Sequence, residues 1–188
     1  LGDLICEIDS LCPTLRVRLG SMAPELLTKK FIDKVSSTRC MVPHFHISMQ
    51  SASDRVLRRM KRRYSRDMAL RNIDYIREKM PDVTISSDII VGFPGETEEE
   101  FTELCNWVRE MKFERAGVFA YSPEEGTPAY KLDGQIDAKT ASARLKKLYS
   151  VQKKVVKNNL KKLIGKTYYL LYLSDIGHLT KTMIKYNH

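Results

Sequence analysis

The segment Asp88-Ile-Ile-Val-Gly-Phe-Pro-Gly-Glu-Thr97 decides the fold class, because it reads as a strand, a tight turn and the start of a helix. Its first half belongs to a β-branched apolar run at 85–91, which is too short for a helix and typical of a strand buried on both faces of a parallel sheet. Gly92, Pro94 and Gly95 then predict a turn with no Cβ at two positions, so that a ligand can approach the backbone closely.

A helix is predicted directly after this turn. Thr97 is suited to cap its N-terminus, and Glu100, three residues on, completes a capping box. The apolar residues that follow recur at helical spacing: Phe101, Leu104, Cys105, Val108 and Met111. In parallel α/β folds, ligands bind at the carboxyl ends of the strands, which makes the turn a candidate binding site, with a purely structural turn as the alternative.

The residues around the turn restrict the ligand. Five acidic residues lie between Glu96 and Glu103, and no Gly-Lys-Ser/Thr follows the glycines. A phosphate loop needs that lysine and a site free of like charge. An uncharged or zwitterionic ligand therefore fits the turn better than a nucleotide phosphate.

Four stretches, in order along the chain, resemble the radical S-adenosylmethionine (SAM) methylthiotransferases, which add a methylthio group to tRNA adenosines or to a ribosomal protein. The turn is one of the four. The others are Arg16-Val-Arg-Leu-Gly-Ser-Met-Ala-Pro24, His44-Phe-His-Ile-Ser-Met-Gln-Ser-Ala-Ser-Asp54 with Arg58-Arg-Met-Lys-Arg-Arg-Tyr-Ser65, and Val118-Phe-Ala-Tyr-Ser-Pro-Glu-Glu-Gly-Thr-Pro128. Four linked motifs make the resemblance strong, where one alone would be weak.

The resemblance implies an α/β fold: the C-terminal part of a radical SAM partial (β/α) barrel at 1–136, a basic connecting helix at 137–164 and the start of a small all-β TRAM-like domain at 165–188. Strands are expected near Leu15, Phe45, Ile85 and Val118. Since the family's barrel has six βα units, the first two would be missing, and we expect the chain to be incomplete.

The resemblance also implies SAM and two 4Fe–4S clusters as cofactors, and an electron donor that reduces the clusters. The implied SAM contacts lie at the ends of three strands and in the glycine turn: Gln50, Ser51, Ser53, Asp88, Gly92, Pro94, Gly95, Phe119 and Tyr121. Other roles stay open for some of them. Ser53 suits a plain helix N-cap, Asp88 could orient backbone from inside the barrel, and aromatic residues in a strand commonly belong to the core. No catalytic residue is identified.

The cysteines and histidines do not predict a metal site. The four cysteines, at 6, 12, 40 and 105, match neither a disulfide framework nor the family's Cys-x-x-x-Cys-x-x-Cys cluster loop. His44 and His46 stand two apart on a predicted strand, and without a third ligand nearby they are best read as polar neighbours on one strand face. Unpaired cysteines suit a reducing compartment, and we expect a cytoplasmic protein.

The net charge of +9 is concentrated in two runs without acids, with seven basic residues at 55–66 and ten at 138–174. Such runs favour a polyanionic partner, although a solvated helix face is the alternative for either one. Tyr64 is available to stack on a base. The predicted RNA contacts are Arg58, Arg59, Arg62, Arg63, Lys146, Lys153 and Lys161. No apolar run approaches the roughly 20 residues of a membrane span, so no membrane partner is expected.

Different motifs in the chain resemble family members that act on different substrates. The stretches that begin at Arg16 and His44 resemble members that act on threonylcarbamoyladenosine beside the tRNA anticodon, whereas the stretch from Gly117 leans toward members that modify a ribosomal protein. We favour tRNA because of the two basic runs. The alternatives are an aspartate of a ribosomal protein, isopentenyladenosine in tRNA, and a non-catalytic RNA-binding protein on a degenerate barrel.

Two local expectations concern the first third of the chain. Residues 15–19 predict a strand on which Arg16 and Arg18 share one face, either toward an anion inside the barrel or toward solvent. Pro24 is suited to open the next helix.

A chain of this extent should form no iron–sulfur cluster, because its cysteines are separated by 6, 28 and 65 positions. A 4Fe–4S cluster needs thiolates that can converge on it. Reconstitution of the 188-residue chain with iron and sulfide should give no stable brown protein, and no deoxyadenosine from SAM and reductant. Formation of either product would show that some of these cysteines are ligands.

Overall fold

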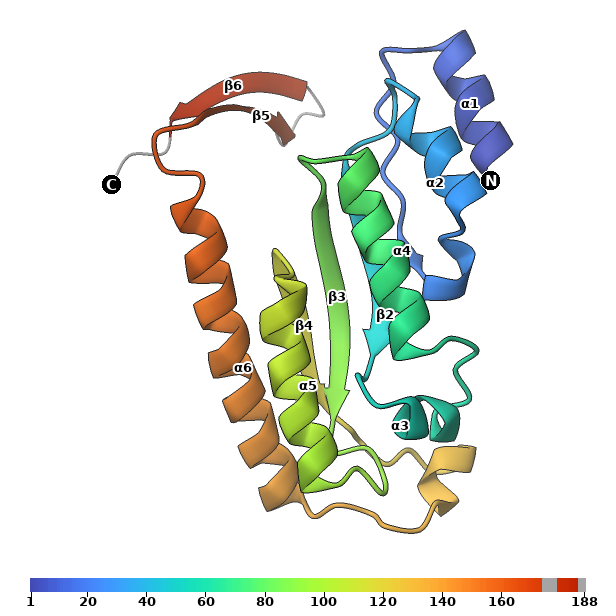
Figure 1. Ribbon diagram of the computed structural model, residues 1–188, viewed down its shortest axis with the longest axis vertical. Helices are drawn as coiled ribbons and strands as arrows, with labels where there is room; N and C mark the ends of the chain where they lie inside the picture. Colours follow the sequence, from blue (N-terminus) through green and yellow to red (C-terminus); the bar gives the residue numbers. More distant parts are fainter. Residues whose placement is uncertain (174–178, 186–188) are drawn as a thin grey trace.

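The computed structural model describes residues 1–173 and 179–185. Its centre is a parallel sheet of four strands in the order β1-β2-β3-β4 (Figure 1), and an antiparallel hairpin follows near the C-terminus. The strands are β1 (Ser21–Met22), β2 (His44–Gln50), β3 (Thr84–Val91), β4 (Arg115–Ala120), β5 (Thr167–Leu173) and β6 (Leu179–Lys185). The helices are α1 (Gly2–Leu11), α2 (Lys29–Ser36), α3 (Asp54–Arg59), α4 (Arg66–Lys79), α5 (Glu98–Met111) and α6 (Ala138–Lys161), with 3-10 turns η1 (Pro24–Leu26) and η2 (Pro128–Lys131).

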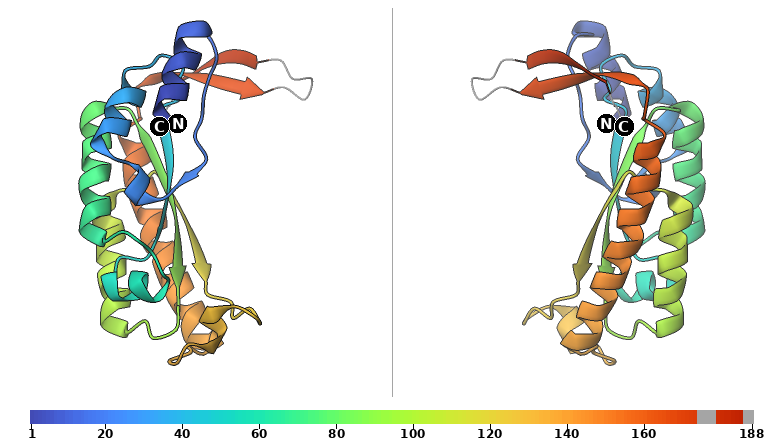
Figure 2. Two further views of the ribbon diagram at one scale, coloured as in Figure 1. Left: turned by 90° about the vertical axis from the view of Figure 1, so that its right-hand side faces the viewer. Right: turned by 90° about the vertical axis from the view of Figure 1, so that its left-hand side faces the viewer.

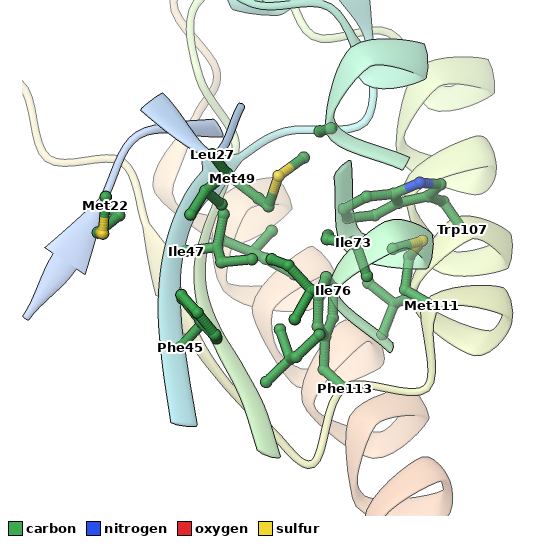
Figure 3. Packing of buried hydrophobic residues seen from close by; sticks show 14 of the residues in the cluster. Met22, Leu27, Phe45, Ile47, Met49, Ile73, Ile76, Trp107, Met111 and Phe113 are labelled. Atoms are coloured by element: carbon green, nitrogen blue, oxygen red, sulfur yellow. The ribbon is translucent and has the colours of Figure 1, made fainter. Parts of the chain in front are cut away.

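The sheet has two different faces. Helices α4, α5 and α6 cover one of them (Figure 2). Along β2, Phe45, Ile47 and Met49 are fully buried, whereas the residues between them, such as His46, are only partly buried. This period-two alternation is that of a strand with one face in the core. Figure 3 shows Phe45 and Ile47 packed with side chains of the covering helices, among them Ile76 of α4 and Met111 of α5.

The α/β class with a parallel sheet is confirmed, and so is the strand–turn–helix unit around the glycines. Strand β3 ends at Val91, and α5 begins at Glu98 behind the capping box of Thr97 and Glu100. The predicted apolar face of α5 is buried throughout: Phe101, Leu104, Cys105, Val108 and Met111. Sequence reasoning succeeds here because every signal in this unit is local.

The strand predicted at 15–19 is wrong. Only Val17 pairs, through an isolated parallel bridge to Met41, and the strand next to β2 is the short β1 at Ser21–Met22. The backbone N–H of Leu15 donates instead to Cys12 O at 3.0 Å, which bends the chain at that point. The segment thus lacks a continuous partner strand.

The helix start predicted at Pro24 is also misplaced. Pro24 opens the 3-10 turn η1, and α2 begins only at Lys29. The reason is that Thr28 is the N-cap of α2: its side chain accepts a hydrogen bond from the Phe31 N–H at 3.2 Å.

The two strands expected after residue 165 are present as the hairpin of β5 and β6. Their assignment to a TRAM-like domain stays a prediction, as do the domain bounds 1–136, 137–164 and 165–188. The predicted strand end at 186 lies outside the described residues.

Gly92 should not tolerate a side chain. Its φ is +74°, and a Cβ there would lie 2.9 Å from the Cβ of Ala141 on α6. We expect Gly92→Ala to lower the free energy of unfolding by about 1–3 kcal/mol, because the left-handed backbone and the contact with α6 both penalise the methyl group. Urea denaturation measures the change. Gly20→Ala is the matched control, since a Cβ at Gly20 would meet nothing within 4 Å; an equal loss in the two variants would contradict this explanation.

Candidate functional site

The parallel strands β2, β3 and β4 have their carboxyl ends at the same edge of the sheet (Figure 1). Most of the predicted SAM residues stand at or just beyond these strand ends. Gln50 ends β2 and pairs with Ile89 of β3, and Val91 at the end of β3 pairs with Ala120 of β4. Gln50 is half-buried with a φ of +59°, a left-handed conformation that is uncommon for a residue with a side chain. Backbone of this kind is concentrated at functional sites.

Ser51 and Ser53 lie at this edge, but their hydroxyl groups already have protein partners. Ser53 Oγ accepts the Val56 N–H at 3.2 Å as the N-cap of α3, and it donates to Glu100 Oε1 at 2.6 Å. Ser51 Oγ accepts the Ser53 N–H at 3.2 Å. Both serines are buried. Both hydroxyl groups thus serve the local fold, and their contact with SAM stays a prediction.

The glycine turn makes its close contacts with protein. The Gly95 N–H donates to Gly134 O at 2.7 Å, and Pro94 O accepts from Arg59 Nε at 3.1 Å. A Cβ at Gly95 would lie 3.2 Å from the Arg59 guanidinium group. Contacts with α6 and Arg59 are thus enough to explain the glycines at 92 and 95, and their packing along the cofactor stays a prediction.

A buried ion pair that sequence reasoning missed holds the same turn. Glu96 is 5% exposed, and Arg144, which lies on α6, is 7% exposed. Arg144 Nη1 lies 2.8 Å from Glu96 Oε2. The same carboxylate oxygen accepts the Gly92 N–H at 2.8 Å. Burial raises the pKa of Glu96, while the Gly92 amide and Arg144 oppose that rise. The sequence did hold a signal, because position 144 falls on the apolar stripe of α6.

The less buried face of the sheet carries a row of hydrogen-bonded polar side chains, which we call the polar ladder: Arg18, His44, Ser86, His46 and Asp88. Arg18 Nε donates to His44 Nδ1 at 3.2 Å, and His44 Nε2 lies 3.1 Å from Ser86 Oγ. Ser86 Oγ is 2.9 Å from His46 Nδ1, and His46 Nε2 is 3.3 Å from Asp88 Oδ2. The two histidines are polar neighbours on one strand face, as predicted.

Asp88 is anchored differently from the prediction. Within the described residues, the Asp88 carboxylate contacts the His46 side chain and accepts no hydrogen bond from the backbone. Its side chain is 41% exposed. The expectation that it orients backbone from inside the barrel is therefore wrong, and one carboxylate oxygen is left on the less buried face.

Phe119 and Tyr121 come from the end of β4. Phe119 is 53% exposed, and Tyr121 packs its ring against Phe93 with the centroids 5.1 Å apart. The Tyr121 hydroxyl is buried and has no hydrogen-bond partner within residues 1–173 and 179–185. An unpaired buried hydroxyl is costly, and no group of the described residues offsets that cost here.

The predicted RNA contacts divide into free and engaged side chains. Arg58, Arg62, Arg63, Lys146, Lys153 and Lys161 are exposed. Arg59 is engaged: it donates to Pro94 O and to the Asp133 carboxylate at 2.7 Å. Tyr64 is only 6% exposed and donates to the backbone oxygens of Ser48 and Met49 at 2.8 Å. The expectation that Tyr64 stacks on a base is wrong, and Arg59 belongs to the support of the glycine turn.

The cysteines do not fit an iron–sulfur cluster. Cys40 and Cys105 are buried, Cys6 is partly buried and Cys12 is exposed. Burial raises the pKa of the Cys105 thiol, which disfavours the thiolate that a cluster needs. No three His, Cys, Asp or Glu side chains of the described chain converge on a metal position. Among the described residues, no helix is long and apolar enough to cross a membrane.

Comparison with known proteins gives a consistent result. Residues 4–108 match the sequence profile of the Radical SAM superfamily. The chain is 40% identical over 171 residues to the tRNA-2-methylthio-N(6)-dimethylallyladenosine synthase of Symbiobacterium thermophilum, covering 90% of this chain and 36% of that protein. It is 44% identical over 172 residues to the ribosomal protein uS12 methylthiotransferase RimO of Alkaliphilus oremlandii, covering 91% and 38%. The chain spans about a third of the length of these relatives.

A solved structure shows the same fold. Coproporphyrinogen III oxidase (HemN) of Escherichia coli, described as a radical SAM enzyme, superposes with a TM-score of 0.62 over 90% of this chain and 38% of its own. Its sequence is 15% identical.

Glu100 should contribute stability that depends on pH. Although burial raises the pKa of its carboxyl group, hydrogen bonds from Arg55, Ser53 and the Thr97 N–H outweigh that effect and lower the pKa to about 2. Because the folded pKa lies below the usual value of 4.5, this contribution is complete above about pH 5 and is lost as the pH falls toward 2.

We expect Glu100→Gln to lower the free energy of unfolding at pH 7 by about 1–2 kcal/mol. The deficit should shrink as the pH falls below 5, and urea denaturation between pH 7 and pH 3 would follow it. Glu103→Gln, on the exposed side of the same helix, is the matched control. A deficit for Glu100→Gln that does not change with pH would contradict the assignment.

Proposed function

Because this chain belongs to the radical SAM superfamily, we propose that it forms part of a methylthiotransferase that modifies an adenosine next to the tRNA anticodon. The observation that carries the proposal is the identity of 40% to a relative named for this chemistry on tRNA, over nearly the whole chain. Threonylcarbamoyladenosine is our expected target, on the motifs that begin at Arg16 and His44. Dimethylallyladenosine, which the relative's name specifies, is the alternative.

The strand-end site suits SAM. Gln50 and Tyr121 stand on either side of the end of β3, each with a side-chain polar group that makes no hydrogen bond within the described chain. Gln50 can donate and accept, and the Tyr121 hydroxyl can do the same. We infer that these two side chains contact the cofactor directly. Ser51, Ser53 and the turn at 92–95 hold the backbone beneath it.

SAM bound in such enzymes supplies a carbon radical that removes a hydrogen atom from the substrate. The residues of this chain would bind and orient the cofactor and keep water away from it. Since the four cysteines do not fit a cluster, we assign no step to them.

Exposed cations favour RNA as the partner. Arg58, Arg62 and Arg63 are exposed at and just beyond the end of α3, the helix that follows Gln50 and Ser53 in the chain. Figure 1 shows α3 next to the carboxyl end of β2, so these residues follow the strand-end site closely in the chain. Phosphates bound there would bring an RNA alongside the cofactor.

Modification of a ribosomal protein is the second candidate. It is favoured by the 44% identity to a relative named for that activity. The same exposed cations would serve a ribosomal target, because ribosomal RNA surrounds such proteins.

RNA binding should depend on these arginines through salt. In the longer protein that carries this chain, Arg62→Ala with Arg63→Ala should weaken binding of a tRNA anticodon stem-loop. Two fewer phosphate contacts should reduce the slope of log Kd against log salt by about 1–2, through lost counterion release. Fluorescence anisotropy measures Kd at salt concentrations from about 50 to about 300 mM, which gives the slope.

The matched double variant is Lys30→Ala with Arg71→Ala, which removes the same charge from exposed positions of α2 and α4. A triple alanine variant of Lys146, Lys153 and Lys161 tests the connecting helix in the same way. Equal slopes in the arginine variant and its control would remove the charge argument for RNA.

A further inference from the structure

The polar ladder has a single direction of hydrogen bonding. Arg18 has only donors, so His44 Nδ1 must accept, and the His44 proton sits on Nε2. Burial lowers the pKa of His44, which agrees with a neutral ring. His44 Nε2–H then donates to Ser86 Oγ, and the Ser86 hydroxyl donates to His46 Nδ1. A neutral His46 then carries its proton on Nε2, directed at Asp88 Oδ2.

The ladder therefore ends on a carboxylate that is held by one oxygen and free at the other. His46 Nε2 contacts Asp88 Oδ2, whereas Asp88 Oδ1 accepts no hydrogen bond from the described residues. This oxygen lies next to Gly117: a Cβ on Gly117 would be 2.6 Å from Asp88 Oδ1 and 2.9 Å from the Phe119 ring. Asp88 Oδ1 and the Phe119 ring thus lie close together over Gly117 and fill the position that a side chain there would need.

The Asp88 carboxylate lies below the strand ends. Asp88 comes three residues before Val91, the end of β3, which is roughly 10 Å along a strand. Gln50 and Tyr121 lie at the strand ends themselves. A ligand at the strand ends and a ligand bound to Asp88 would therefore occupy different places on the sheet.

We propose that Asp88 and Phe119 form the subsite for the target base, in which Asp88 Oδ1 accepts the N–H of the exocyclic nitrogen of an N⁶-monosubstituted adenine. The Phe119 ring, 53% exposed, supplies a flat surface for the base. This inference rests on the proposed function and moves Asp88 and Phe119 from the cofactor to the substrate.

The same geometry selects against the ribosomal substrate. An aspartate side chain offers no hydrogen-bond donor when ionised, and it would bring a second negative charge beside Asp88. The neighbours of Asp88 on the ladder do not offset this, because His46 already donates to Oδ2 and Arg18 lies at the far end. An N⁶-monosubstituted adenine is uncharged at its ring and carries one N–H that matches the free oxygen.

The test compares two RNAs that differ in this N–H. A tRNA anticodon stem-loop carries either N⁶-methyladenosine, which has the N–H, or N⁶,N⁶-dimethyladenosine, which lacks it, at the target position. In the longer protein that carries this chain, the first RNA should bind about tenfold more tightly, the low end of what a hydrogen bond to a charged group provides. In Asp88→Ala this preference should vanish, whereas it should persist in Asp74→Ala, which removes an exposed carboxylate on α4.

Each other outcome overturns something definite. A preference that is unchanged in Asp88→Ala would be steric and would overturn the subsite. A loss of SAM affinity in Asp88→Ala, with the RNA preference intact, would return Asp88 to the cofactor. If neither RNA binds the wild-type protein while a peptide from the ribosomal substrate does, the RNA function itself is wrong.

Discussion

The buried carboxylate of Glu96 is the contact on which the candidate site depends. It accepts hydrogen bonds from the Gly92 N–H and from Arg144 Nη1, both at 2.8 Å, and so ties the turn after β3 to the long helix α6. A buried charge is tolerated only with such partners, and removing one of them leaves the other uncompensated, at about 3–5 kcal/mol. The turn is thus fixed from the helix side of the sheet, and Gly134 and Arg59 hold it through Gly95 and Pro94.

The two faces of the sheet carry out different tasks. One face is apolar and is sealed by α4, α5 and α6, with Phe45 and Ile47 fully buried. The other carries the polar ladder, whose exposed and partly buried side chains are joined by hydrogen bonds from Arg18 to Asp88 Oδ2. A face of this kind cannot form a second apolar core, since that would strip water from polar groups. A polar ligand would therefore suit this face better than an apolar one.

The sequence predicted what local signals determine and missed what distant pairing determines. The unit around Gly92 and Thr97 was predictable, because strand length, turn residues and capping box all lie within a few positions. Tyr64 was misread because its partners, Ser48 and Met49, are about 15 residues away. The pair of Glu96 and Arg144 spans 48 positions, and each residue alone resembled a surface charge. The prediction of a strand at 15–19 was wrong for the same reason, since a strand needs a neighbouring strand, which the local sequence pattern does not identify.

The same distinction refines the charge argument for RNA. Of the seven cations at 55–66, three are engaged by acids elsewhere in the fold: Arg55 by Glu100, Arg59 by Asp133 and Arg66 by Glu110. The other four, Arg58, Lys61, Arg62 and Arg63, are exposed without an acidic partner in the described chain. Folding therefore leaves four exposed cations without acidic partners at and just beyond the end of α3. Phosphates bound by these cations would lie beside the helix that follows β2, so the position of the free cations, more than their number, would link the proposed RNA binding to the proposed cofactor site.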